Sequence, residues 1–224
     1  LMTLLLLAVA PVFIIIIYIY LKDLYEKEPK RLLLYNFLFG AVISIIITTI
    51  LYLVLDIALP FQDKQTVFQQ FIKAFFIVAL VEEFSKYVIV RYISQKNKAF
   101  NEPFDGIVYA VMVSMGFAAT ENIFYVLEGG AEVALLRAFT AVPAHATFGI
   151  LMGYFMGKAK FSKNKAYLNL TGLFAAFLFH GAYDFFLFID FIPGIWLGAL
   201  VSLIVAIILS RKAIKRHQNR SHFK

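Results

Sequence analysis

The sequence predicts an all-α, polytopic membrane protein of about seven transmembrane helices, with its N-terminus outside and its C-terminus in the cytoplasm. Three observations support this prediction. Of the 224 residues, 62% are hydrophobic and only 16% are charged, a balance outside the usual range of soluble domains. The chain contains several apolar runs of the roughly 20 residues that cross a bilayer core about 30 Å thick. Lysine and arginine gather in alternate loops.

Apolar runs of helical length define the expected spans. They leave almost nothing for a soluble domain, so residues 1–224 are expected to form a single membrane domain. The first run lacks a basic segment before it, and "AVA" lies within the run, so we interpret it as a span and not as a cleaved signal. The expected helices are residues 4–20, 33–59, 68–93, 106–127, 134–157, 167–189 and 194–210.

The basic loops orient these helices. Loops rich in lysine and arginine face the cytoplasm by the positive-inside rule, and the opposite loops, "FQDKQT", "EGGAE" and "DFIP", contain Lys64 alone. The net charge of +7 therefore follows from topology and from attraction to anionic lipid, and gives no argument for nucleic acid. The cytoplasmic cations are Lys22, Lys27, Lys30, Arg31, Arg91, Lys96, Lys98, Lys158, Lys160, Lys163, Lys165, Arg211, Lys212, Lys215, Arg216, Arg220 and Lys224.

Polar residues inside the expected spans gather on four consecutive helices. A charge at mid-bilayer costs about 2.5 to 3.5 kcal/mol, so such residues face the interior of a bundle and usually mark a functional path. From the helical rise, Glu82, Glu121, His145 and His180 are expected within about 12 Å of one another along the membrane normal, at a depth where they can share one cavity. The polar residues are Lys73, Glu82, Glu83, Lys86, Glu121, Asn122, Arg137, His145, His180 and Asp184.

Several of these residues also have structural interpretations. Glu82 and Lys86 stand four residues apart with the acid first, the favoured order for an ion pair on a helix. That pair leaves Glu83, turned 100° away, unexplained. His180 and Asp184 lie one turn apart in "HGAYD", which also fits a polar contact between helices.

Residues around the fifth expected helix have structural interpretations as well. Arg137 lies near the outer interface, where snorkelling is the expected explanation. Pro143 is expected to kink the helix and free a backbone carbonyl beside the cavity. Gly149, Gly153 and Gly157 repeat at four-residue spacing, which predicts close packing against a neighbouring helix.

Five segments together resemble the PrsW family of intramembrane proteases, which is related to the CAAX prenyl endopeptidase superfamily. They are "YLKDLYEKEP", "VEEFSKY", "FDGIVYAVMVSMGFAATENIFYV", "VPAHATFGILMGYFMGKAKFS" and "FLFHGAYDF", and they cover nearly the whole chain. The resemblance implies a multi-pass protease of the bacterial plasma membrane. It also implies that the partner is a single-span anti-sigma factor, which receives its first cut on the outer side in response to envelope stress.

One spacing departs from the wider superfamily. Its double-glutamate motif usually has an arginine four residues after the second acid, whereas Lys86 lies three residues after Glu83 and four after Glu82. The sequence therefore leaves open which of the two acids is the base and which is paired.

The residues themselves permit hydrolysis by an activated water. The chain has no cysteine, which excludes a thiol nucleophile and a disulfide framework. Glu82 or Glu83 is the expected base, since amide hydrolysis by water needs a base, an acid and an electrophile. Two imidazoles and a carboxylate also suit an open zinc site. The expected metal ligands are Glu121, His145 and His180.

Two alternatives remain open at this point. With the metal bound, Asp184 would orient His180 or polarise the scissile carbonyl. In a metal-free mechanism, a glutamate activates the water and His180 stabilises the oxyanion. Buried acids and histidines also build proton relays, so a proton- or ion-coupled transporter would use the same residue types. No inverted repeat is detectable in the sequence, which favours the protease.

Overall fold

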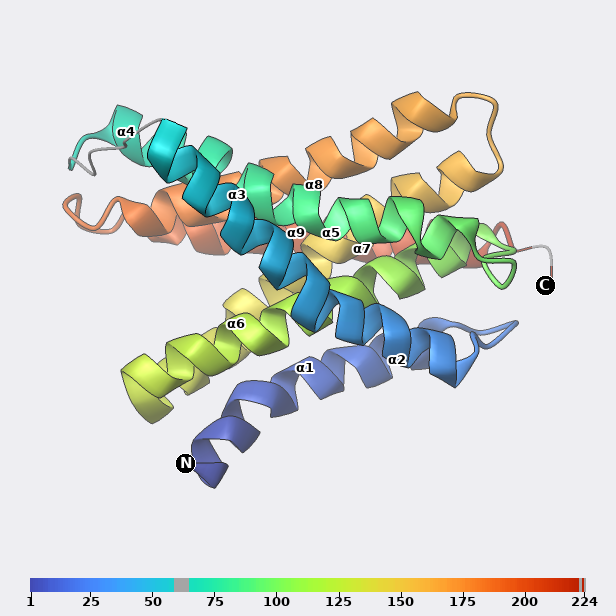
Figure 1. Cartoon of the computed structure of the whole chain (residues 1–224), viewed down its shortest axis with the longest axis horizontal. Helices are drawn as coiled ribbons and strands as arrows, with labels where there is room; N and C mark the ends of the chain where they lie inside the picture. Colours follow the sequence, from blue (N-terminus) through green and yellow to red (C-terminus); the bar gives the residue numbers. More distant parts are fainter. Residues whose placement is uncertain (59–64, 222, 224) are drawn as a thin grey trace.

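The structure is a computed structural model that describes residues 1–58, 65–221 and 223. Lys64 and Lys224, two of the cations used to orient the helices, lie outside these residues. The described residues form helices and contain no strand, which confirms the all-α prediction (Figure 1). The elements are α1 (Met2–Lys22), α2 (Lys30–Leu38), η1 (Phe39–Ser44), α3 (Ile45–Ala58), α4 (Val67–Ile72), η2 (Lys73–Ala79), α5 (Leu80–Tyr92), η3 (Ser94–Lys96), α6 (Pro103–Phe139), α7 (Ala141–Lys160), α8 (Lys165–Phe188) and α9 (Leu197–Gln218).

Five helical segments in the described part of the chain are long and apolar enough to cross a membrane: Met2–Lys22, Lys30–Ala58, Pro103–Lys160, Lys165–Phe188 and Leu197–Gln218. The expected count of seven differs for two reasons. Pro103–Lys160 has 58 residues, far more than one span needs, and combines two expected helices. The run from α4 to α5 carries several charges and is not among the five. The count of seven and the orientation of the termini stay predictions.

The chain bends twice between α6 and α7. Gly130 adopts a φ of 72° inside α6, a left-handed conformation that glycine reaches without steric cost. Thr140, with φ −121° and ψ −75°, then separates α6 from α7. The fifth helix was expected to start at residue 134, but α7 starts at Ala141. The "EGGAE" segment therefore bends the chain as expected, while the start of α7 is displaced.

The expected fifth helix is interrupted within one turn before Pro143, at Thr140, where a proline disturbs the preceding turn, although Pro143 itself lies inside α7. It is the third residue of α7. Backbone N–H groups in the first turn of a helix have no intrahelical acceptor, so a proline there removes no helical hydrogen bond. The break at this end of α7 lies at Thr140 and precedes the proline.

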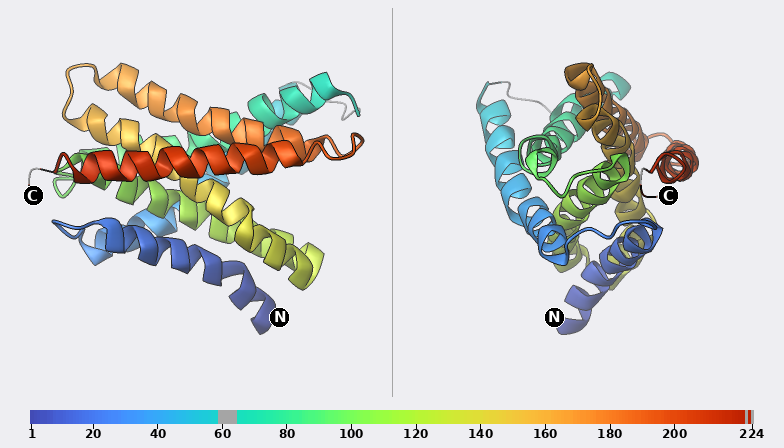
Figure 2. Two further views of the ribbon diagram at one scale, coloured as in Figure 1. Left: turned by 180° about the vertical axis from the view of Figure 1, so that it is seen from behind. Right: turned by 90° about the vertical axis from the view of Figure 1, so that its right-hand side faces the viewer.

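The helix α6 occupies the centre of the bundle. Its residues from Phe104 to Ala119 are buried without exception, and it packs against α1, α2, α5, α7 and η1. Figure 2 shows it surrounded by the other helices in the right-hand view. A helix that is apolar on all sides is buried on all sides, which explains why no polar stripe marks this segment in the sequence.

Glycines bring α7 against α6 at close range, as the four-residue spacing predicted. A Cβ on Gly153 would lie 2.3 Å from the carbonyl oxygen of Gly106, and one on Gly157 would lie 2.0 Å from that of Pro103. Neither position accepts a larger residue without moving a backbone. This contact fixes α7, and with it His145, relative to α6.

Candidate active site

The first turn of α5 carries two acids and leads to a buried lysine. The exposed fraction is 5% for Glu82, 0% for Glu83 and 1% for Lys86. The segment before them, η2, is π-helical, a geometry that often occurs beside functional sites. Charges at this burial persist only when partners compensate them. The partners of the two acids differ.

Glu83 is held by two donors. Its Oε1 accepts hydrogen bonds from Lys86 Nζ at 2.6 Å and from His180 Nδ1 at 2.9 Å. The residue does not line the cavity described below. A carboxylate that receives the Nδ1 proton of a histidine fixes the tautomer and orientation of its ring. Glu83 therefore orients His180, which explains the acid that the sequence interpretation left without a partner.

Glu82 faces the opposite way, into the cavity. Its Oε1 accepts a hydrogen bond from Tyr52 OH at 3.1 Å. Its Oε2 lies 3.7 Å from Lys86 Nζ and 4.0 Å from His180 Nε2. This buried oxygen has no hydrogen-bond partner among the described residues. A carboxylate oxygen that accepts no hydrogen bond and lies beside two histidines is available to hold a water molecule or a metal ion.

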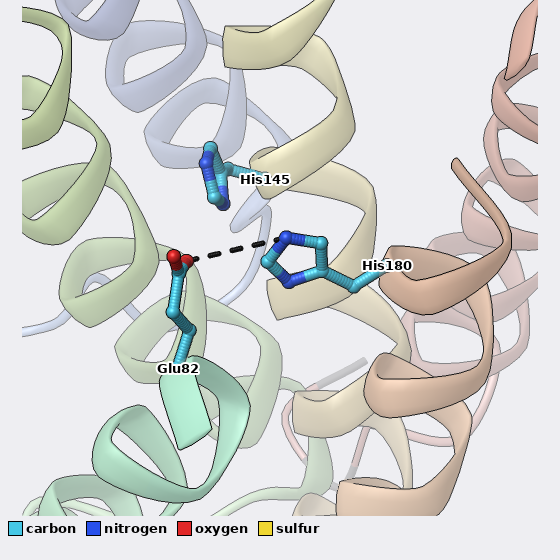
Figure 3. A group of neighbouring side chains, drawn as sticks. All are labelled: Glu82, His145 and His180. Atoms are coloured by element: carbon cyan, nitrogen blue, oxygen red, sulfur yellow. Dashed lines mark ion pairs between the residues drawn. The ribbon is translucent and has the colours of Figure 1, made fainter. Parts of the chain in front are cut away.

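Glu82, His145 and His180 converge from three helices. One potential ligand atom from each lies within 4.8 Å of the others. Glu82 comes from α5, His145 from α7 and His180 from α8, and their side chains point toward a common centre (Figure 3). The sequence analysis expected Glu121 in this group, whereas the structure brings Glu82 there. The expectation that Glu121 is itself a ligand stays a prediction.

His180 presents its second nitrogen to carboxylates. Nε2 lies 3.2 Å from Asp184 Oδ2, in addition to its approach to Glu82. If the proton on Nδ1 is donated to Glu83, a neutral ring has only a lone pair at Nε2. Three hydrogen-bond acceptors then lie close together: His180 Nε2, Asp184 Oδ2 and Glu82 Oε2. A cation satisfies all three, whether it is a second proton on the ring or a metal ion.

His145 uses both ring nitrogens. Lys86 Nζ lies 3.3 Å from Nδ1, and Glu121 Oε2 lies 2.9 Å from Nε2. Because an ammonium group only donates, Nδ1 accepts and Nε2 carries the proton donated to Glu121. A metal ion bound by His145 would replace one of these two contacts.

Arg137 belongs to this network, with contacts that the snorkelling interpretation did not include. Its Nη2 lies 2.7 Å from Glu121 Oε2, and its Nε donates to Asn122 Oδ1 at 2.5 Å. The bend at Gly130 turns the end of α6 back on itself and brings Arg137 to these partners, which lie 15 and 16 residues earlier. No sequence periodicity predicts such a pair.

A cavity of about 1260 Å³ gives access to the group. Five of the six predicted site residues line it, and Glu83 does not. Arg137, Tyr52, Thr48 and Thr49 add polar groups to walls that are otherwise mainly apolar. The lining residues from the predicted site are Glu82, Glu121, His145, His180 and Asp184.

Sequence reasoning missed Tyr52. The polar residues predicted to mark the site all lie on the third to sixth expected helices, and Tyr52 lies on the second. One signal was present: Ser44, Thr48 and Tyr52 repeat at four-residue spacing, which places three hydroxyl groups on one face of a helix.

Comparison with known proteins assigns the family. Residues 28–211 match the PrsW family intramembrane metalloproteases. The chain belongs to this family. It is 39% identical over 191 residues to Protease PrsW of Geobacillus kaustophilus, with 85% of this chain and 82% of that protein covered.

Further PrsW relatives agree. Protease PrsW of Oceanobacillus iheyensis is 41% identical over 180 residues, and that of Bacillus subtilis is 38% identical over 183 residues, each with 80% of both chains covered. No solved structure matches the chain. Family membership and the apolar helices together make this protein an intramembrane protease of a bacterial membrane, which it crosses several times.

Proposed function

We propose that this PrsW-family protease makes the first cut in a membrane-anchored anti-sigma factor, on the outer side of the membrane, with Glu82 as the base. One observation supports the proposal: Oε2 of Glu82, which has no hydrogen-bond partner in the described part of the chain, faces His145 and His180 at the wall of the cavity. Membership of a protease family favours hydrolysis over proton-coupled transport by the same residue types.

The chemistry needs one water molecule and one proton carrier. Glu82 takes a proton from the water as its oxygen bonds to the scissile carbonyl carbon. The same carboxyl group then returns the proton to the amide nitrogen as the carbon–nitrogen bond breaks, which leaves a new carboxyl end and a new amine. A protonated His180, oriented by Glu83 and Asp184, would stabilise the oxyanion.

A metal ion fits the same residues as an alternative to this mechanism, because Glu82 and His180 cannot hold a metal ion while Glu82 acts as the free base and His180 is protonated. Glu82, His145 and His180 would hold it, since their ligand atoms lie within 4.8 Å of one another and one carboxylate oxygen lacks a partner in the described part of the chain. Two histidines and a glutamate are a ligand set that zinc uses in proteases. When bound, zinc acts as a Lewis acid and lowers the pKa of water. Glu121 would hold His145, and Glu83 would hold His180.

The proposed topology has seven spans, an outside N-terminus and a cytoplasmic C-terminus in one membrane domain. The run from α4 to α5 counts as the third span, and α6 and α7 count separately. In this orientation the site lies between the midplane and the outer surface. The scissile bond would then lie in the outer part of a partner's single span or just beyond it, where the backbone is less protected by helical hydrogen bonds.

Cleavage of a tagged single-span substrate in liposomes tests the proposal. Glu82→Gln should lower the rate by roughly 10² to 10⁴-fold, the usual contribution of a general base. Glu132→Gln, at an exposed acid of α6, should cut like the wild type. Mass spectrometry should place the cut in the outer third of the substrate span. Wild-type cleavage by Glu82→Gln would refute the mechanism, and a cut in the cytoplasmic third would refute the orientation.

A further inference from the structure

The second long helical run brings one functional group to the proposed base. Tyr52 lies on α3, and its hydroxyl donates to Glu82 Oε1 at 3.1 Å. Tyr52 also lines the cavity beside Glu82 and His180. A hydroxyl group that contacts one oxygen of a carboxylate, while the other oxygen stays unpaired, controls the direction in which the unpaired oxygen points.

Two more hydroxyl groups, on the same face of this helical run as Tyr52, bond the run to α5. Ser44 Oγ lies 2.6 Å from Ser85 Oγ, and Thr48 Oγ1 donates to Ser85 Oγ at 2.9 Å. Ser85 Oγ in turn donates to the backbone oxygen of Glu82 at 2.7 Å. The ladder of Ser44, Thr48 and Tyr52, one residue per turn, therefore reaches Glu82 at its backbone and at its carboxylate.

The ammonium group of Lys86 competes with the Tyr52 hydroxyl group for the Glu82 carboxylate. Lys86 Nζ lies 3.7 Å from Glu82 Oε2, just beyond hydrogen-bond distance. In a low-dielectric interior these opposite charges attract strongly. Terminal torsions of glutamate are broad, so an unrestrained carboxylate would turn toward the ammonium group. The Tyr52 hydroxyl group lies at the other oxygen and opposes this rotation.

We propose that Tyr52 is a positioning residue for Glu82: its hydroxyl keeps the carboxylate from closing onto Lys86 and directs Oε2 toward His145 and His180. The inference rests on the proposed role of Glu82. It assigns a role in the reaction to α3, a helix whose main contacts in the described chain are with α5 and η1.

Kinetics of the full-length protein with the single-span substrate test this role. Tyr52→Phe keeps the ring and removes only the donor. Its kcat should fall about tenfold or more, because a hydrogen bond to a charged group is lost. KM should stay within about twofold, because the substrate itself loses no contact. Tyr52→His, which can restore a ring N–H donor, should recover part of kcat.

Two matched variants separate positioning from packing. Tyr109→Phe changes a buried tyrosine that also donates to a carboxylate, that of Glu28, but does not line the cavity, and should retain the wild-type kcat. Ser94→Ala removes a buried hydrogen bond to Asn36 Oδ1 outside the cavity lining, so it should lower thermal stability and keep kcat per folded molecule. Tyr52→Phe should show the reverse pattern.

The outcomes separate this inference from the proposed function. Wild-type kcat in Tyr52→Phe, with Glu82→Gln inactive, would overturn the role of Tyr52 alone. A fall in kcat that Tyr52→Phe shares with Ser94→Ala, in proportion to lost stability, would also overturn it. Full activity of both Tyr52→Phe and Glu82→Gln would instead remove the proposed function.

Discussion

The candidate active site and the junction between the α1–α2 loop and α6 both bury carboxyl groups, but they balance the charge differently. At the site, Lys86 and Arg137 lie against Glu83 and Glu121. At the loop junction, defined here as Asp23, Glu28, Asp105 and Tyr109, carboxyl groups face one another and Tyr109 OH donates to Glu28 Oε2.

At the loop junction a proton neutralises Glu28 at neutral pH, whereas Asp23 is ionised above about pH 6. Burial and the nearby Asp105 carboxyl raise the pKa of Glu28 to about 10, and burial raises the pKa of Asp23 to about 6. Glu28 also shares a hydrogen bond with Asp105, which requires a proton on one of the two. Buried carboxylates with cationic partners, such as Glu83 and Glu121, stay charged. A buried carboxyl group that faces other acids, such as Glu28, is protonated instead.

The largest expected difference between the two clusters is in metal binding. In the metal-bound alternative, zinc per mole of purified protein should be stoichiometric and should fall strongly in His145→Ala and His180→Ala, while Glu28→Gln should retain it. A chelator should abolish cleavage and added zinc should restore it. A fully active, chelator-resistant preparation without stoichiometric metal would favour hydrolysis by Glu82 and His180 alone. Equal loss of zinc in Glu28→Gln would contradict the prediction that only the candidate active site binds the metal.

The next largest effect is expected in how the free energy of unfolding depends on pH, through the acids of the loop junction. A folded-state pKa above the unfolded value means that the folded state binds more protons, so stability is lost as pH rises. The contribution of Glu28 to the free energy of unfolding decreases between its unfolded-state pKa of about 4.3 and its folded-state pKa of about 10. The decrease is up to ~1.4 kcal/mol per pH unit. The contribution of Asp23 to stability is lost by about pH 6.

Denaturant unfolding of wild type and Glu28→Gln between pH 4 and 8 measures this slope. The variant should lose most of the pH dependence above pH 6, and the two proteins should converge near pH 4, where Glu28 is protonated in both states. A wild-type free energy of unfolding that rises with pH would contradict protonation of the loop junction.

The smallest effect is expected from Tyr109→Phe. The variant removes one buried donor to Glu28 and should lower the free energy of unfolding by about 1 kcal/mol. Its cleavage rate per folded molecule should equal that of the wild type, because Tyr109 does not line the cavity. A loss of kcat without loss of stability would show that the loop junction takes part in the reaction.

Sequence patterns predicted a large part of this site. The cost of a charge in lipid pointed to Glu82, Glu83, Glu121, His145 and His180, and the structure gathers them around one cavity. Depth along a helix follows from residue number at 1.5 Å per residue, so their common depth was accessible. Rotation about the helix axis was not, because it depends on which neighbours pack against each face.

The sequence by itself determined the membrane class, from composition, and the glycine contact of α6 with α7, from spacing. It also determined the family, from five motifs. Only the tertiary structure decided that Glu82 faces the cavity while Glu83 holds His180, that Arg137 pairs with Glu121, and that Tyr52 reaches Glu82. These pairs join residues 16 to 97 positions apart. Helical periodicity relates only residues a few turns apart, whereas packing between helices sets which distant side chains meet.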